Sequence, residues 1–184
     1  QIFLTLDPVA EKPVFSVYAI NYSKLNVKIY AVQPSDWPGF KQYLRDWQRT
    51  DIPVKMPGRL VSDKSLHLDL SPDTLTQVDI GLSEFMDSKF GQFVFIIEPP
   101  RGLFESENEK WRRYSQTVNA WVQVTQIGLD AYTDYSDMLV WANELKTGVP
   151  LEGVSIQSSL GSEKHTTGSD GMLRFAIPTG AKYL

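Results

Sequence analysis

The sequence predicts an all-β protein made of two β-sandwich modules in tandem, with one short helix inserted in the first. Apolar and polar residues alternate in short runs, the period of half-buried strands, at residues 25–31, 66–70 and 173–177, and residues 92–97 place Phe93, Phe95 and Ile97 on one strand face. Turn-forming pairs such as Pro57-Gly58 and Asp170-Gly171 separate these runs. Short strands at this spacing are typical of a sandwich or a barrel. The chain has 184 residues, 42% of them hydrophobic, which suits one large domain or two modest ones with packed cores.

One segment has the helical period instead. Over about residues 37–49 the apolar side chains recur three and four positions apart, and Pro38 suits a first helical turn. Ser35 or Asp36 is the expected N-cap. We expect an amphipathic helix of about three turns that covers an open end of the first sandwich. An aromatic docking face is the alternative interpretation of the same residues: Trp37, Phe40, Tyr43, Leu44 and Trp47.

The modules are expected to span residues 1–118 and 119–184. The polar stretch 105–116 has no β-type alternation, so we predict a loop or a crossover between sheets there. The chain opens in an apolar run at residues 2–6, and residues 180–184 resemble the start of another strand. Both ends therefore suggest a segment of a longer chain, with the second module lacking its last strand.

Charge and composition exclude several functions. The net charge is −4 and neither half is basic, so no nucleic-acid partner is expected. No apolar run reaches 18 residues, so we expect no membrane insertion by this segment. The chain has no cysteine, which excludes disulfides, thiolate metal sites and cysteine nucleophiles.

Catalytic and metal-binding signals are scarce, and we predict no catalytic residue, no cofactor and no metal. The two histidines, His67 and His165, lie in different modules outside any metal-binding spacing, and both are expected on solvated strands or hairpins. No nucleophile elbow or phosphate-binding loop occurs. Three aspartates, Asp130, Asp134 and Asp137, suggest either a calcium site or a hairpin tip, and turn geometry favours the tip.

The five tryptophans leave two interpretations open. A carbohydrate platform needs aromatic rings exposed in a row, and Trp37 and Trp111 are its candidates. Trp121 and Trp141 lie inside strands beside Val122 and Val140, which suits a core or an interface between modules.

The second module carries the most specific motifs. Four strings follow one another: WVQVTQIGL at 121–129, MLVWAN at 138–143, LKTGVPLEGVSI at 145–156 and TGSDGMLRF at 167–175. They resemble the macroglobulin (MG) domains of bacterial alpha-2-macroglobulin-like proteins, in which V-T-x-I-G-L, V-W-x-x-x-L-x-T-G-x-P-x-x-G-V and T-x-x-D-G recur in this order. The resemblance is strongest over residues 120–177, and the first module is compatible with it. It implies tandem immunoglobulin-like, macroglobulin-type β-sandwiches.

The resemblance also implies a function. It indicates scaffold domains of a large exported protease inhibitor, periplasmic or at the cell surface, that traps proteases by conformational change. The implied partners are neighbouring domains of the parent chain and, through the full-length protein, target proteases. Many members carry a thioester built from Cys and Gln, which this chain cannot form because it has no cysteine. The alternative is an extracellular adhesin-type or carbohydrate-binding module.

Two further expectations concern the joint between the modules. Residues 105–116 contain Lys110, Arg112 and Arg113 and could be a protease-cleaved bait, but an ordinary exposed loop is the simpler interpretation. The candidate inter-domain contacts are the aromatic residues beside the joint: Trp111, Tyr114 and Trp121.

Overall fold

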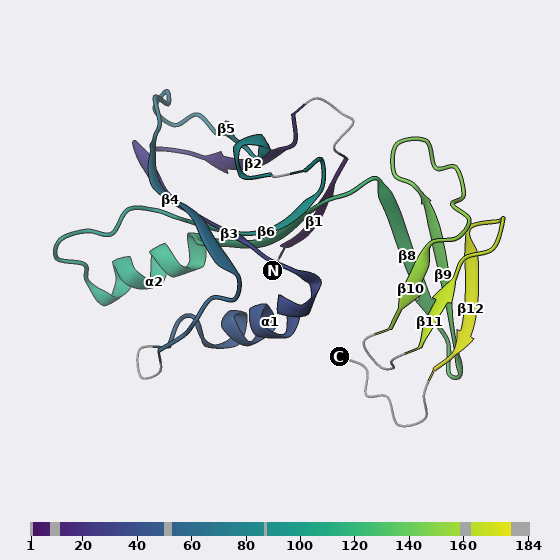
Figure 1. Ribbon diagram of the computed structural model, residues 1–184. Coiled ribbons are helices and arrows are strands. Elements are labelled where there is room, and N and C mark those ends of the chain that lie inside the picture. Colours follow the sequence, from purple (N-terminus) through teal and green to yellow (C-terminus); the bar gives the residue numbers. More distant parts are fainter. Residues whose placement is uncertain (1, 8–11, 50–52, 87, 159–162, 178–184) are drawn as a thin grey trace. The chain divides into compact units, whose positions relative to one another are not determined.

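The computed structural model describes residues 2–7, 12–49, 53–86, 88–158 and 163–177 (Figure 1). The chain forms two compact units, residues 1–124 and 125–184. The boundary lies six residues later than the sequence predicts, because β7 (Val118–Val124) is hydrogen-bonded between β1 and β6 of the first unit. The strand start expected at residues 180–184 lies outside the described residues.

The first unit contains a five-stranded sheet in the order β1-β7-β6-β3-β4. The β1 strand (Ile2–Leu6) runs parallel to β7, and the other neighbours pair antiparallel. The remaining strands of this sheet are β3 (Lys24–Ala31), β4 (Arg59–His67) and β6 (Gly91–Glu98). A second, two-stranded sheet pairs β2 (Val14–Ala19) with β5 (Thr76–Gly81).

Both faces of the large sheet are apolar, and each face has its own cover. On one side Phe93, Phe95 and Ile97 of β6 pack against the β2–β5 sheet. On the other side Val94 and Ile96 pack against the helix α1 (Trp37–Asp46). Figure 1 shows α1 beside the large sheet. A strand whose successive residues are all buried must lie between two layers, because neighbouring side chains point to opposite faces.

The helix predicted at about residues 37–49 is confirmed, but its predicted location is wrong. It covers the face of the large sheet rather than an open end of the sandwich. Phe40 is fully buried, and its ring centroid lies 5.5 Å from that of Trp121 on β7. Trp37 meets the same indole edge-on at 5.2 Å. The helix packs on the face of the sheet because Trp121 on that face supplies the ring that Trp37 and Phe40 contact.

The predicted loop at residues 105–116 is also wrong, because most of this stretch forms a second helix, α2 (Glu107–Gln116). The all-β class is confirmed, since the described residues form twelve strands and only two helices, with short 3-10 turns at Pro34–Asp36 and Ser83–Phe85. The alternation at residues 66–70 belongs to β4 only as far as His67.

The second unit consists of a three-stranded antiparallel sheet, in the order β12-β9-β8, and a short hairpin. The sheet strands are β8 (Ile127–Thr133), β9 (Asp137–Glu144) and β12 (Met172–Ala176). The hairpin pairs β10 (Ser155–Gln157) with β11 (Lys164–Thr166). The predicted turn before the last strand is confirmed at Gly171, which has a φ of +72° and lies so close to Ala142 that a Cβ would meet its carbonyl oxygen.

We predict that Phe40→Ala lowers the stability of the first unit by about 3–5 kcal/mol, because it removes a fully buried ring from between α1 and the sheet. Urea unfolding followed by tryptophan fluorescence measures this change, since Trp37, Trp47, Trp111 and Trp121 all belong to this unit. Leu75→Ala is the control, because Leu75 is 64% exposed and its loss is expected to cost less than about 0.5 kcal/mol. Equal stabilities for the two variants would contradict the anchoring role of Phe40.

Candidate functional site

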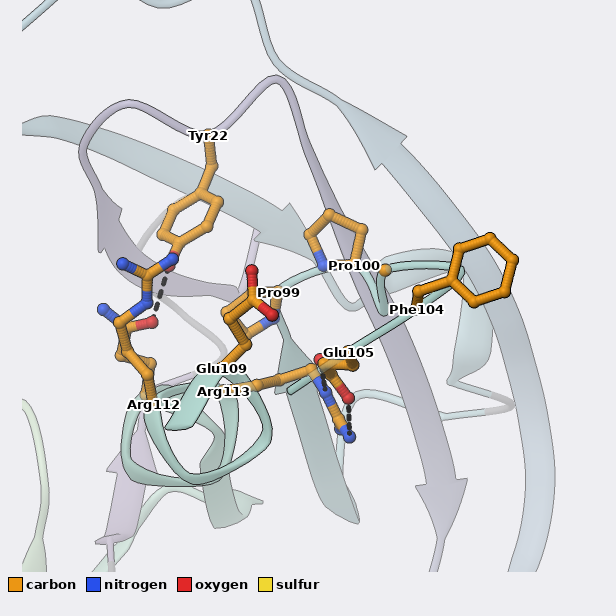
Figure 2. A pocket seen from close by; sticks show the side chains of 10 residues that line it. Tyr22, Pro99, Pro100, Phe104, Glu105, Glu109, Arg112 and Arg113 are labelled. Atoms are coloured by element: carbon orange, nitrogen blue, oxygen red, sulfur yellow. Dashed lines mark hydrogen bonds and ion pairs between the residues drawn. The ribbon is translucent and has the colours of Figure 1, made fainter. Parts of the chain in front are cut away.

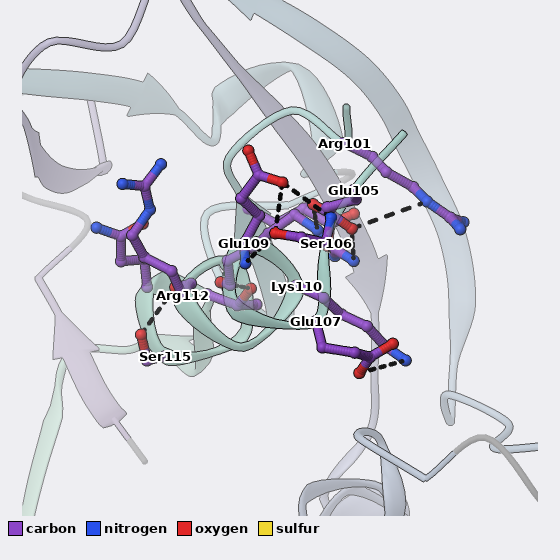
Figure 3. Close-up of polar contacts among 12 residues, drawn as sticks. Arg101, Glu105, Ser106, Glu107, Glu109, Lys110, Arg112 and Ser115 are labelled. Carbon is purple, nitrogen blue, oxygen red and sulfur yellow. Dashed lines mark hydrogen bonds and ion pairs between the residues drawn. The ribbon is translucent and has the colours of Figure 1, made fainter. Parts of the chain in front are cut away.

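The segment that links β6 to β7 carries a network of polar contacts, which Figure 3 shows. Its centre is Arg113, whose side chain is only 12% exposed. The guanidinium donates to both carboxylate oxygens of Glu105, from Nε at 2.9 Å and Nη2 at 3.1 Å. It also donates from Nη1 to Glu98 at the end of β6, at 3.2 Å. One side chain therefore ties together the strand, the loop and the helix.

The N-terminus of α2 is closed by a capping box. The Ser106 hydroxyl accepts a hydrogen bond from the Glu109 backbone N–H, and the Ser106 N–H donates to the Glu109 carboxylate at 2.8 Å. The four letters Ser106-Glu107-Asn108-Glu109 are a recognisable start signal for a helix. Sequence reasoning missed it because the helix that follows has no apolar stripe and no buried residue.

A small cleft of about 200 Å³ lies beside this helix, and Figure 2 shows the side chains around it. The acidic groups in the cleft are engaged within the fold. Hydrogen bonds from Arg113 lower the pKa of the Glu105 carboxyl, and hydrogen bonds from Ser106 lower that of Glu109. Both groups therefore stay ionised at neutral pH and are poor proton donors. The arrangement holds α2 in place and does not resemble an acid–base pair.

The three predicted contact residues all lie in the first unit, but they are not gathered at one surface. Trp111 is 72% exposed on α2. Tyr114 packs edge-on against Trp47 of the α1 C-terminus, with ring centroids 5.4 Å apart. Trp121 is 1% exposed beneath α1, and its Nε1–H donates to Gln92. Their contact with a second domain stays a prediction, and Trp111 is the one whose ring is available for it.

The two histidines lie in different units. His67 is exposed at the end of β4. His165 lies on β11, where its ring stacks on Phe175 at a centroid distance of 4.9 Å. In the part of the chain that the structure describes, no three His, Cys, Asp or Glu side chains gather as a metal site. Across the same residues, no helix has both the length and the apolar character needed to cross a membrane.

The aspartates of the second unit form a hairpin turn between β8 and β9. The Asp134 carboxylate accepts hydrogen bonds from the backbone N–H groups of Ser136 and Asp137. These bonds lower the pKa of Asp134, and Arg174 adds a nearby positive charge. The carboxylate thus serves turn geometry, as the sequence interpretation favours.

The tryptophans do not form the exposed row that carbohydrate stacking requires. Trp111 is exposed and Trp121 is buried, while Trp37, Trp47 and Trp141 are half-buried. Trp111 is the one exposed tryptophan among the described residues, and a stacking platform needs more than one exposed ring.

Comparison with known proteins was made by family, by sequence and by structure. No family model matches the chain, and no curated protein matches it in sequence. Its structure matches native alpha-2-macroglobulin from Escherichia coli over domains NIE-MG1, with a TM-score of 0.62 and 16% identity, covering 98% of this chain and 86% of that one. The chain shares the fold of these alpha-2-macroglobulin domains. The resemblance seen in the sequence is thus confirmed at the level of fold.

Two longer structures of the E. coli protein also match this chain. The segment MG0-NIE-MG1 of the same E. coli protein matches with a TM-score of 0.58 and 16% identity, over 95% of this chain and 54% of that one. Trypsin-activated E. coli alpha-2-macroglobulin matches with a TM-score of 0.59 and 15% identity, over 96% of this chain. The chain spans 54% of the first and 12% of the second.

Glu105→Gln is expected to destabilise α2 at pH 7 and to have little effect in acid. Arg113 lowers the Glu105 pKa in the folded state, so the contribution of this pair is complete above the ordinary glutamate pKa. It is lost as the pH falls through the lower, folded-state pKa. Thermal unfolding of the wild type and the variant between pH 7 and pH 3 measures the difference, which narrows in acid. Glu107→Gln is the matched control, since Glu107 is 90% exposed and its ion pair among the described residues is a 3.9 Å contact with Lys110.

A difference in unfolding temperature between the wild type and Glu105→Gln that stays constant across this pH range would contradict the ionic role of Glu105. A gap equally large for Glu107→Gln would instead indicate a general effect of lost acidic charge on α2.

Ser106→Ala is expected to accelerate trypsin cleavage after Lys110, Arg112 or Arg113. Loss of an N-cap lowers the stability of a helix by about 1 kcal/mol. The locally unfolded form of α2, which trypsin can cleave, would then be about fivefold more populated. Mass spectrometry of the early products measures the rate at each site. Ser115→Ala is the control, because the Ser115 hydroxyl donates only to the Arg112 carbonyl near the end of the helix. If both variants accelerated cleavage equally, the Ser106 cap would not be what protects α2 from local unfolding.

Proposed function

We propose that the chain forms two non-catalytic scaffold units of a large, exported bacterial protein of the alpha-2-macroglobulin type. The observation that carries this proposal is the fold match over 98% of the chain to the E. coli segment NIE-MG1. The first unit would correspond to the domain named NIE and the second to MG1, because this chain has two consecutive compact units and the matched segment has two consecutive domains. The activity of the whole protein would be protease inhibition by entrapment, in the periplasm or at the cell surface.

The internal chemistry of the first unit supports a structural role. Its large sheet is covered on both faces, and the carboxylates beside α2 are fixed by Arg113 and Ser106. Such groups brace a fold and leave no proton-transfer pair for catalysis. The chain also resembles the native conformation and the trypsin-activated form of the E. coli protein to a similar degree, with TM-scores of 0.57 and 0.59. A unit that keeps its fold while its parent rearranges is what a scaffold requires.

A trapping assay on the complete gene product tests the proposal. A protease inside a closed chamber still meets small substrates but not large proteins. We therefore expect trypsin mixed with the gene product to keep its activity on a short chromogenic peptide and to lose most of its activity on a large protein such as casein. The 184-residue chain alone is the control, and it should change neither activity.

Equal retention of both activities after mixing would contradict entrapment. Loss of both activities would indicate direct blocking of the active site, which would also replace the scaffold model.

A further inference from the structure

The three-stranded sheet of the second unit has one covered face. The side chains of Val140 and Leu173 lie on this face, opposite one another on β9 and β12, and Val140 is only 2% exposed. Phe175 follows on the same face and stacks on His165 of the β10–β11 hairpin. Ile156 of the hairpin is 8% exposed. The hairpin therefore forms the core of this unit with one side of the sheet (Figure 1).

The opposite side, here named the open face, carries the alternate side chains of the same strands. Strand register places them in two neighbouring rows, in which each residue lies beside its partners on the adjacent strands. The first row is Asp130, Trp141 and Met172, and the second is Tyr132, Leu139 and Arg174.

The open face is unusually apolar for a solvated sheet. Tyr132 is 61% exposed, Met172 45% and Leu139 37%, and Trp141 is half-buried between them. An antiparallel sheet with one packed face normally shows polar residues on the other. In the first unit the second apolar face lies beneath α1. In residues 125–158 and 163–177, which are described for the second unit, no helix covers the open face.

Charge narrows the kind of partner that fits this face. Arg174 is paired with Asp137 at 2.8 Å and with Asp134 at 3.9 Å. Asp130 forms no ion pair with any described residue, although it lies in the same row as Trp141. The apolar centre thus has an acidic rim, which favours a partner that brings a lysine or arginine.

We propose that the open face is the docking surface for another domain of the same polypeptide, one that presents apolar side chains and a basic residue opposite Asp130. This rests on the proposed function, since a multidomain chain supplies such a domain at high effective concentration. The chain spans only 12% of the trypsin-activated E. coli protein, so a related full-length chain offers many other domains. A second copy fits less well, because it would bring two acidic rims together. An anionic membrane is disfavoured for the same reason.

Hydroxyl-radical footprinting with mass spectrometry tests the proposal, because Tyr132, Trp141 and Met172 all carry oxidisable side chains. The complete gene product is compared with the 184-residue chain. We expect oxidation of Tyr132 and Met172 to fall about fivefold or more in the complete product, as their exposed fractions drop to those of an interface core. Tyr18, which is 65% exposed in the first unit, is the internal reference.

A charge variant separates docking from a general change in reactivity. Asp130→Lys in the complete product is expected to raise the oxidation of Met172 at least about twofold, since a cation would then face a cation. Asp69→Lys makes the same charge change on an exposed residue of the first unit and should leave the oxidation unchanged. Thermal unfolding of both variants confirms that they remain folded.

The outcomes are distinct. Equal oxidation of the open face in both proteins overturns the docking surface while leaving the scaffold function standing. A gene product no longer than this chain overturns the scaffold function and, with it, the partner named here. Concentration-dependent protection in the 184-residue chain alone would identify a second copy as the occupant, which also overturns the proposal.

Discussion

The first unit depends on one constraint: its central strands are apolar on both faces. In β6 the five residues Phe93 to Ile97 are all buried, so the sheet is stable only with a layer on each side. The β2–β5 sheet supplies one layer and α1 the other. Trp121 shows the consequence most clearly, because its indole is enclosed by Trp37 and Phe40 of the helix. Without α1, this strand would expose a large aromatic surface to water.

The second helix follows from a different kind of interaction. Packing of Tyr114 against Trp47 joins α2 to the end of α1, but α2 has no buried residue of its own. Its place is fixed instead by the bidentate pair of Arg113 with Glu105 and by the Ser106 cap. Directional polar contacts, one at the N-cap and one in the last turn, fix the position of this short helix with little apolar burial. This difference explains why α1 belongs to the core and α2 to the surface.

The two helices also mark the limit of sequence reasoning. The three- and four-residue spacing of Phe40, Tyr43 and Trp47 predicts α1, because local periodicity encodes an apolar face. The α2 segment lacks that period, and its capping box is the sequence signal that indicates a helix. The boundary between the units depends on strand pairing between distant residues, which puts Val124 opposite Leu6 and Gly91. The boundary passes through the motif string at 121–129, since residues 121–124 belong to β7 and the second unit begins at Thr125. The ion pair of Arg113 with Glu105 left no signal at all in the sequence.

Trp121 and Trp141 show why the same local sequence leads to different surfaces. Each lies within a strand beside a buried valine, Val122 and Val140, and this pattern allows either a core or an interface. The first sheet has a helix folded over its second face, so Trp121 is 1% exposed. In the described part of the second unit no such helix follows, and Trp141 stays half-buried in a row with Met172. How deeply a strand tryptophan is buried therefore depends on the element that covers its face of the sheet. Where the unit itself supplies no cover, a protein surface of matching chemistry is the physical complement of the sheet.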